Sequence, residues 1–178
     1  TYTNNNLTRV SDGMDRALTL AYDTNHKLST VSDGTRTINF GYTSNDLTSV
    51  VDALGKITIY TYNSDSLMTS STLPEGNTPY TQTFYENGKV ATQVDSDENT
   101  LSFDYSGFDT TITDTLNSSK VHTHTATGEL NNIQDQTGQD ISIGSDATGR
   151  RNSITDRLGD TTSYDYHVAI GKMSSLTN

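Results

Sequence analysis

The feature that most constrains the fold of this chain is an internal repeat. A Leu-x-x-Val pattern, or a close variant of it, returns about every 21 residues, a period found in repeat architectures. The units begin at Leu7, Leu28, Leu47, Leu67, Val90, about Ile112, Leu130, Arg151 and Met173. Each unit continues with a turn signal, an alternating strand and a polar loop, so the pattern predicts one antiparallel β-hairpin per unit.

The second strand of each predicted hairpin alternates between apolar and polar residues. Because side chains in a strand point to opposite faces in turn, every second residue shares a face. The apolar residues that share a face in this way are Leu18, Leu20 and Tyr22; Ile38, Phe40 and Tyr42; Tyr60 and Tyr62; Leu101, Phe103 and Tyr105; and Tyr164 and Tyr166. The residues between them are mostly Thr, Ser, Asn and Asp, as expected for a solvated face.

An Asp-x-x-Gly signal predicts the turn within each hairpin. Asp at the first turn position accepts a hydrogen bond from the main chain two residues on, and Gly at the last position tolerates a positive φ. The predicted turns are Asp12-Gly13, Asp33-Gly34, Asp52–Gly55, Asp114–Asn117, Asp135–Gly138 and Asp156–Gly159.

Some units depart from this pattern. The units at Leu67 and Val90 lack the Asp-x-x-Gly signal, and the Leu130 unit has Ile141 and Ile143 where aromatic residues are expected. In addition, Leu and Val three residues apart do not share a face of a regular strand. A β-bulge, or partial burial on both faces, would reconcile the two positions.

Composition and charge exclude several classes of function. The formal net charge of −11 argues against binding to nucleic acid or anionic lipid, since both require a basic patch. No apolar run is long enough to span a membrane, so no membrane insertion is expected. The first residues lack the basic and apolar regions of a signal peptide. Without Cys, the chain has no disulfide and no thiolate chemistry.

Candidate metal ligands occur in two patterns, and each has a simpler structural interpretation. His122 and His124 lie on one face of a strand at a spacing that can chelate Zn²⁺ or Ni²⁺. They also occupy the positions of the paired tyrosines in neighbouring units, and we favour that interpretation. The recurrent acids could form a Ca²⁺-binding ladder, but each lies where a turn already favours Asp: Asp12, Asp33, Asp52, Asp95, Asp114, Asp135 and Asp156.

No catalytic motif is present. A uniform repeat singles out no carboxylate pair for glycosidase chemistry, and the chain has neither a Gly-x-Ser-x-Gly elbow nor a Gly-rich phosphate loop. We therefore expect no enzyme activity, no catalytic residues, no cofactor and no metal. The tyrosines could stack on sugar rings, but they recur once per unit beside Leu, Ile and Phe. That placement favours a face buried against a second layer or an enclosed cargo.

The spacing of Tyr22-Asp23, Leu28, Tyr42, Leu47, Asp52, Gly55 and Tyr60-Thr61-Tyr62 resembles the RHS or YD repeat. This family includes bacterial secreted polymorphic toxins, shell proteins of insecticidal toxin complexes, wall-associated bacterial proteins and animal teneurins. The resemblance covers essentially the whole chain. It implies a continuous β-hairpin strip that spirals into a hollow shell, which in toxin members encloses a C-terminal effector polypeptide.

The resemblance and the repeat together predict an all-β fold, a repetitive antiparallel β-hairpin ribbon of about 21-residue units that curves as part of a spiral shell. Residues 1–178 are expected to form a single array of about eight hairpin repeats, cut from a longer repeat region. The expected function is structural: a shell segment that encapsulates or displays a toxin or effector in a larger secreted or cell-surface bacterial protein. Its partners would be further repeats and the enclosed effector of the same polypeptide. The alternative is a carbohydrate- or receptor-binding surface module of an adhesin or wall protein, with a cell-surface glycan or receptor as partner.

Overall fold

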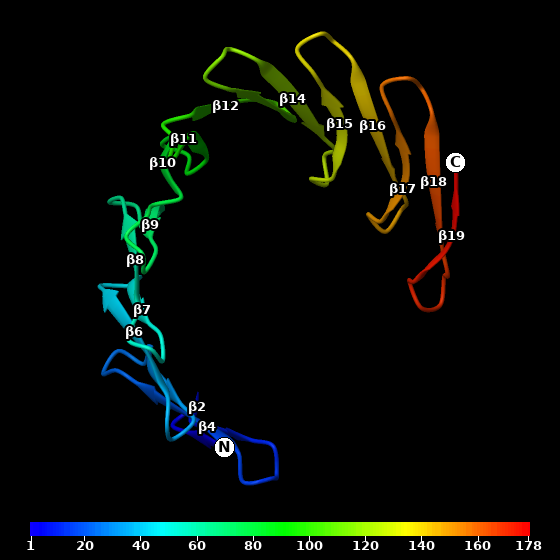
Figure 1. Cartoon of the computed structure of the whole chain (residues 1–178). Coiled ribbons are helices and arrows are strands. Elements are labelled where there is room, and N and C mark those ends of the chain that lie inside the picture. The colour runs from blue at the N-terminus through cyan, green and yellow to red at the C-terminus, as the bar shows by residue number, and fades with distance from the viewer. The chain divides into compact units, whose positions relative to one another are not determined.

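The structure, a computed structural model, describes residues 1–178, and its regular elements are all β-strands. The chain divides into two compact units: Thr1–Lys89 with Val94–Glu98, and Val90–Gln93 with Asn99–Asn178. Within each unit, antiparallel hairpins lie side by side in one sheet (Figure 1). The all-β hairpin ribbon predicted from the repeat is therefore confirmed.

The first unit contains ten strands. A short pair, β1 and β2, precedes a sheet in which each strand from β3 to β10 pairs with the next. Their bounds are β1 Tyr2–Thr3, β2 Asn6–Leu7, β3 Arg9–Ser11, β4 Ala17–Tyr22, β5 Leu28–Ser32, β6 Thr37–Thr43, β7 Asp46–Val51, β8 Ile57–Tyr62, β9 Met68–Thr72 and β10 Tyr80–Phe84.

The second unit contains the sheet from β12 to β19, again with each strand paired to the next. Strand β11, Val90–Asp95, is divided between the two units. The remaining bounds are β12 Thr100–Ser106, β13 Asp109–Thr113, β14 Ser119–His124, β15 Leu130–Gln134, β16 Asp140–Ser145, β17 Arg151–Thr155, β18 Thr161–Tyr166 and β19 Met173–Thr177.

A β-bulge recurs through the array and explains the three-residue spacing of Leu and Val. Between β4 and β5, Leu20 pairs with Val31 and Ala21 with Thr30, but Tyr22 pairs with Leu28. One extra residue therefore lies between Leu28 and Thr30, which brings Leu28 and Val31 onto the same face as Leu20 and Tyr22. The same register shift occurs before Tyr42, Tyr62, His124, Ser145 and Tyr166.

The turns at both ends of the hairpins share one geometry. In the turn between β7 and β8, the N–H of Asp52 donates to the carbonyl of Lys56 at 2.9 Å, and the N–H of Gly55 donates to the carbonyl of Asp52 at 3.0 Å. This is the three-residue hairpin loop in which a type I turn ends in a left-handed residue. The same pair of bonds closes the turns that begin at Asp23, Asn63, Leu73, Tyr85, Asp114, Thr125, Asp135, Asp146 and Asp156. The tips predicted at Asp52–Gly55 and Asp156–Gly159 are thus equivalent, and Asp33-Gly34 forms a shorter turn between β5 and β6.

The structure corrects one detail of the predicted repeat. The unit placed at Leu67 begins one residue later, because Met68 is the residue that pairs with Tyr62. The units at Leu67 and Val90, which lack Asp-x-x-Gly, nevertheless form tight turns. Leu73 replaces Asp in the first, and Glu98 replaces Gly in the second with a φ of 66°. Each turn keeps part of the preferred sequence, Pro74 and Gly76 in the first and Asp95 in the second.

Neither unit has a conventional core. Ile143, 9% exposed, is the one buried hydrophobic residue, and no buried polar or charged residue occurs. The reason is geometric, because a ribbon one sheet thick has two faces and no second layer within the unit. The face that carries Leu20, Tyr22, Phe40 and Tyr42 is half-buried by neighbouring side chains, whereas Leu18 on the same face is exposed.

We predict that the left-handed turn position controls stability. Gly55 has a φ of +81°, so Gly55→Val should lower the free energy of unfolding by about 1–3 kcal/mol, the usual cost of a strained backbone conformation. Asn117 occupies the equivalent position at φ 60°, and Gly55→Asn should therefore cost less than half as much. Urea unfolding of the three proteins measures both changes, and equal losses for Val and Asn would contradict this account of the turn.

Candidate functional site

The tyrosine that ends one strand of a unit is tied to the preceding hairpin by its hydroxyl group. The Tyr22 hydroxyl donates to the Leu7 carbonyl at 2.9 Å, and the Tyr62 hydroxyl donates to the Leu47 carbonyl at 2.8 Å. Equivalent bonds join Tyr105 to the Val90 carbonyl at 3.0 Å and Tyr166 to the Arg151 carbonyl at 2.6 Å. In all four cases the acceptor lies 15 residues earlier. The sequence pattern predicted the apolar role of these rings, but not this polar contact.

Basic residues that directly follow a turn contact the tyrosine of the following hairpin. The guanidinium of Arg150 lies 4.7 Å from the centre of the Tyr166 ring, and the ammonium of Lys27 lies 5.3 Å from that of Tyr42. Both distances fall within the range of cation–π attraction. Asp146 also accepts a hydrogen bond from Arg150 at 2.8 Å. Ring, carboxylate and cation thus form a local network that joins consecutive hairpins.

The two histidines stand in the positions of the paired tyrosines, as the sequence pattern indicates. His124 follows the bulge of its unit, and its Nδ1 lies 3.4 Å from the Phe108 carbonyl. His122 lies opposite Ile133. Burial lowers the pKa of His122, and the charges of His124 and Lys120 add to this shift. No cluster of three or more His, Cys, Asp and Glu side chains suited to a metal ion occurs in the structure.

The turn aspartates use their carboxylates to hold the main chain. Asp33 Oδ1 accepts the N–H groups of Thr35 at 3.0 Å and Arg36 at 2.7 Å, and its Oδ2 accepts the Arg36 guanidinium at 2.7 Å. These donors, the Arg36 main chain foremost, lower the pKa of Asp33 to about 2. A hydrogen bond from the Thr148 hydroxyl is the main cause of the lowered pKa of Asp146. Each carboxylate is thus engaged in its own turn, which is the structural role that the sequence favoured.

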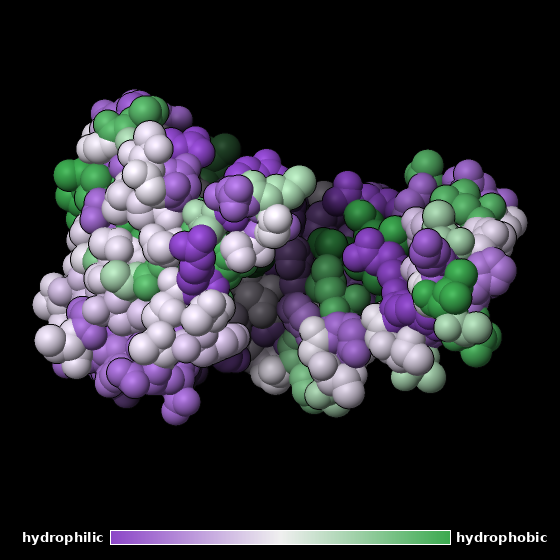
Figure 2. Space-filling model, turned by 90° about the horizontal axis from the view of Figure 1, so that it is seen from below, coloured by the Kyte–Doolittle hydropathy of each residue, from purple (hydrophilic) through white to green (hydrophobic).

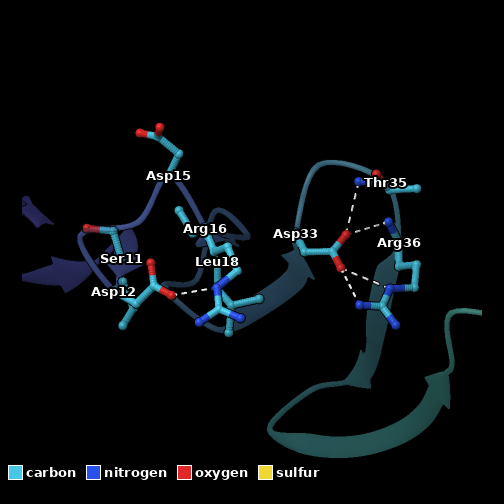
Figure 3. A pocket seen from close by; sticks show the side chains of 10 residues that line it. Ser11, Asp12, Asp15, Arg16, Leu18, Asp33, Thr35 and Arg36 are labelled. Carbon is cyan, nitrogen blue, oxygen red and sulfur yellow. Dashed lines mark hydrogen bonds and ion pairs between the residues drawn. The ribbon is translucent and has the colours of Figure 1, made fainter.

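A hollow of about 540 Å³ lies in the first unit beside the tips at Asp12 and Asp33 (Figure 3). Its lining includes Val10 and Leu18, with the ion pairs Asp12–Arg16 at 2.6 Å and Asp33–Arg36 at 2.7 Å. Asp15 points away from these pairs (Figure 3). This hollow has an apolar floor and a charged rim, and it contains no nucleophile–base arrangement.

Hydrophobic residues also reach the surface elsewhere. Figure 2 shows them as separate patches among polar residues. Exposed apolar side chains are present both on strands, as at Ile57 and Ile59, and at turn tips, as at Leu54. Ile57 and Ile59 lie on the face of β8 opposite to Tyr60 and Tyr62, so this strand carries apolar residues on both faces.

Comparison with known proteins supports the family resemblance. Residues 42–78 match the family described as RHS Repeat. This segment contains one complete example of the Tyr42, Leu47, Asp52, Gly55 and Tyr60-Thr61-Tyr62 pattern. No curated protein sequence matches the chain.

Two solved structures share the fold. A chain of the Photorhabdus luminescens Tc holotoxin pore aligns with a TM-score of 0.56 and 12% identity over 90% of this chain and 10% of its own length. A chain of the TcdB2–TccC3 crystal structure aligns with a TM-score of 0.60 and 10% identity over 85% of this chain and 11% of its own length. The protein therefore spans about a tenth of these relatives and has the same hairpin ribbon.

Residues 42–78 match an RHS repeat, as the Tyr, Asp and Gly spacing of that segment predicted. The same hairpin turn geometry recurs along the rest of the chain. The structure contains no helix long and apolar enough to cross a membrane.

We predict that the tyrosine hydroxyl stabilises the ribbon. Tyr62→Phe leaves the half-buried Leu47 carbonyl without this donor and should lower the free energy of unfolding by about 1 kcal/mol. Tyr60→Phe is the matched control, since the Tyr60 hydroxyl makes no hydrogen bond, and should change stability by under about 0.5 kcal/mol. Chemical denaturation measures both values. An equal effect of the two substitutions would show that ring packing alone matters.

We also predict a specific acid dependence. Because the pKa of Asp33 is lowered on folding to about 2, its contribution to stability is complete above about pH 4, the pKa range of an unperturbed Asp. The contribution is lost as the pH falls through about 2. The difference in unfolding free energy between the native sequence and Asp33→Asn should therefore be constant between about pH 5 and 7 and shrink towards about pH 2. A difference that does not vary with pH would contradict this role of the carboxylate.

Proposed function

We propose that the chain is a wall segment of an RHS-repeat shell that encloses or displays a toxin or effector in a larger secreted or cell-surface bacterial protein. The observation that carries the proposal is the half-buried Leu, Phe and Tyr face of the ribbon. This face repeats through both units, yet Ile143 is the one hydrophobic residue that the chain buries by itself. A face of this kind gains stability when further repeats or an enclosed polypeptide cover it.

The continuous hydrogen bonding of the sheet also suits a wall. Within each unit every interior strand pairs on both sides, so few open edges remain to pair with an enclosed chain. The partners we propose are parts of the same polypeptide, namely further repeats and a C-terminal effector. In this role the chain needs no catalytic residue, and we propose that it is not an enzyme.

Protection from protease tests the proposal in the full-length protein. The polypeptide that follows the repeats should resist digestion while the repeat array is intact, and it should be degraded rapidly when it is produced without the array. The residues 1–178 segment alone should give no protection, because it is part of a wall. Equal digestion of the following polypeptide with and without the array would overturn enclosure.

The alternative is a carbohydrate- or receptor-binding module, favoured by the same partly exposed aromatic face. Phe103 distinguishes the two roles. Phe103 pairs with Ile112 and is half-buried, whereas Ser102 is exposed. For a wall, Phe103→Ala should lower the unfolding free energy by about 1.5–2 kcal/mol, roughly half the cost of a fully buried Phe, and Ser102→Ala by under about 0.5 kcal/mol. Unchanged stability with lost binding on a glycan array would favour the binding module.

A further inference from the structure

A histidine of the second unit lies on the half-buried face of the ribbon. His122 on β14 is half-buried itself, with Thr110 of β13 opposite it on one side and Ile133 of β15 on the other. Ile112 of β13 and Leu130 of β15 are further neighbours on the same face. None of these four neighbours carries a charge, so this part of the face offers little to stabilise a positively charged ring.

The charged groups that share this face with His122 are cations. Lys120 and His124 lie two residues before and after it on β14, and therefore on the same face. Tyr105 of β12 lies in the same row beyond Thr110, and its hydroxyl donates to the Val90 carbonyl.

The carboxylates of the packed strands lie elsewhere. Those on strands are on the opposite face of the sheet: Asp104 of β12, Asp109 of β13 and Asp140 of β16. Strand β15 has no charged residue. Asp114 and Glu129, in the turns on either side of β14, accept hydrogen bonds within their own turns. No carboxylate of these strands and turns therefore pairs with the His122 ring.

Protonation of His122 is unfavourable in the folded chain for this reason. Burial is the main cause that lowers the pKa of His122, and the positive charges of His124 and Lys120 lower it further. In the unfolded chain the ring titrates near the ordinary value of about 6.5. The unfolded chain therefore binds the proton more tightly, so stability that is present above this pH is lost as the pH falls below about 6.5.

We propose that the pairing of β13, β14 and β15 is an acid-sensitive joint of the ribbon, which loosens when His122 takes up a proton. At the equivalent position other hairpins carry Tyr60 and Tyr164, and a phenol stays neutral in mildly acidic solution. The joint weakens while distant hairpins keep their packing, because coupling in a repeat array is mainly between nearest neighbours. This response does not depend on whether the ribbon encloses an effector.

Urea unfolding of the chain at two pH values tests the proposal, with a metal chelator present throughout. Between about pH 7.5 and about pH 5, the folding equilibrium constant of the native sequence should fall about threefold or more relative to that of His122→Tyr. This substitution restores the residue of the other hairpins and removes the titrating group. His167→Asn is the matched control, because His167 is exposed in the turn before β19, and it should leave the pH dependence of the native sequence unchanged.

A carboxylate placed opposite His122 provides a second test. Thr110→Asp should reduce the loss on acidification by about half or more, since an opposite charge favours the protonated ring. In the native chain, amide hydrogen exchange should show protection that falls in β13–β15 on acidification and is retained in β6–β8.

An NMR titration of the native chain needs no variant, and the His122 ring should titrate below about pH 6.5. A loss of stability that persists in full in His122→Tyr, an unchanged loss in Thr110→Asp, or a His122 titration at or above about pH 6.5 would overturn the proposal.

Discussion

A sheet one layer thick cannot enclose a hydrophobic core, and this constraint shapes the whole molecule. Apolar burial, the dominant stabilising term in most domains, is limited here to a half-covered face. Hydrogen bonds from side chains to the main chain therefore contribute a larger share of the stability. Turn carboxylates hold the tips, and in four units a tyrosine hydroxyl group joins the hairpin to the one before it. Each interaction is modest, but it recurs in unit after unit.

The contacts also remain local in sequence. The tyrosine bonds span 15 residues, and the cation–π contacts join adjacent hairpins. Stability in such an array is approximately a sum of unit and nearest-neighbour terms. A substitution in one unit should therefore change the stability of the neighbouring hairpins and have little effect beyond them.

Much of this architecture could be predicted from sequence because its determinants are local. Alternation of Leu20 and Tyr22 defines a strand face, and Asp52 with Gly55 defines a turn. The three-residue spacing of Leu28 and Val31 left open a bulge or partial burial on both faces, and the structure shows the bulge. The tyrosine hydroxyl bonds could not be predicted, since their acceptors are main-chain carbonyls that any residue supplies. The turn at Leu73 lacks Asp, but Pro74 and Gly76 are turn residues that the sequence does supply.

The bulge has a consequence for how such genes change in length. Because side chains alternate between faces, removal of a single residue from a strand would exchange the apolar and polar faces of everything paired beyond it. Removal of one whole unit, from one bulge to the next, leaves the alternation, the tyrosine acceptor and the turn of each remaining hairpin intact. Insertions and deletions that survive selection in this array should therefore come in steps of a complete repeat, so that the ribbon is lengthened or shortened while each face keeps its apolar or polar character.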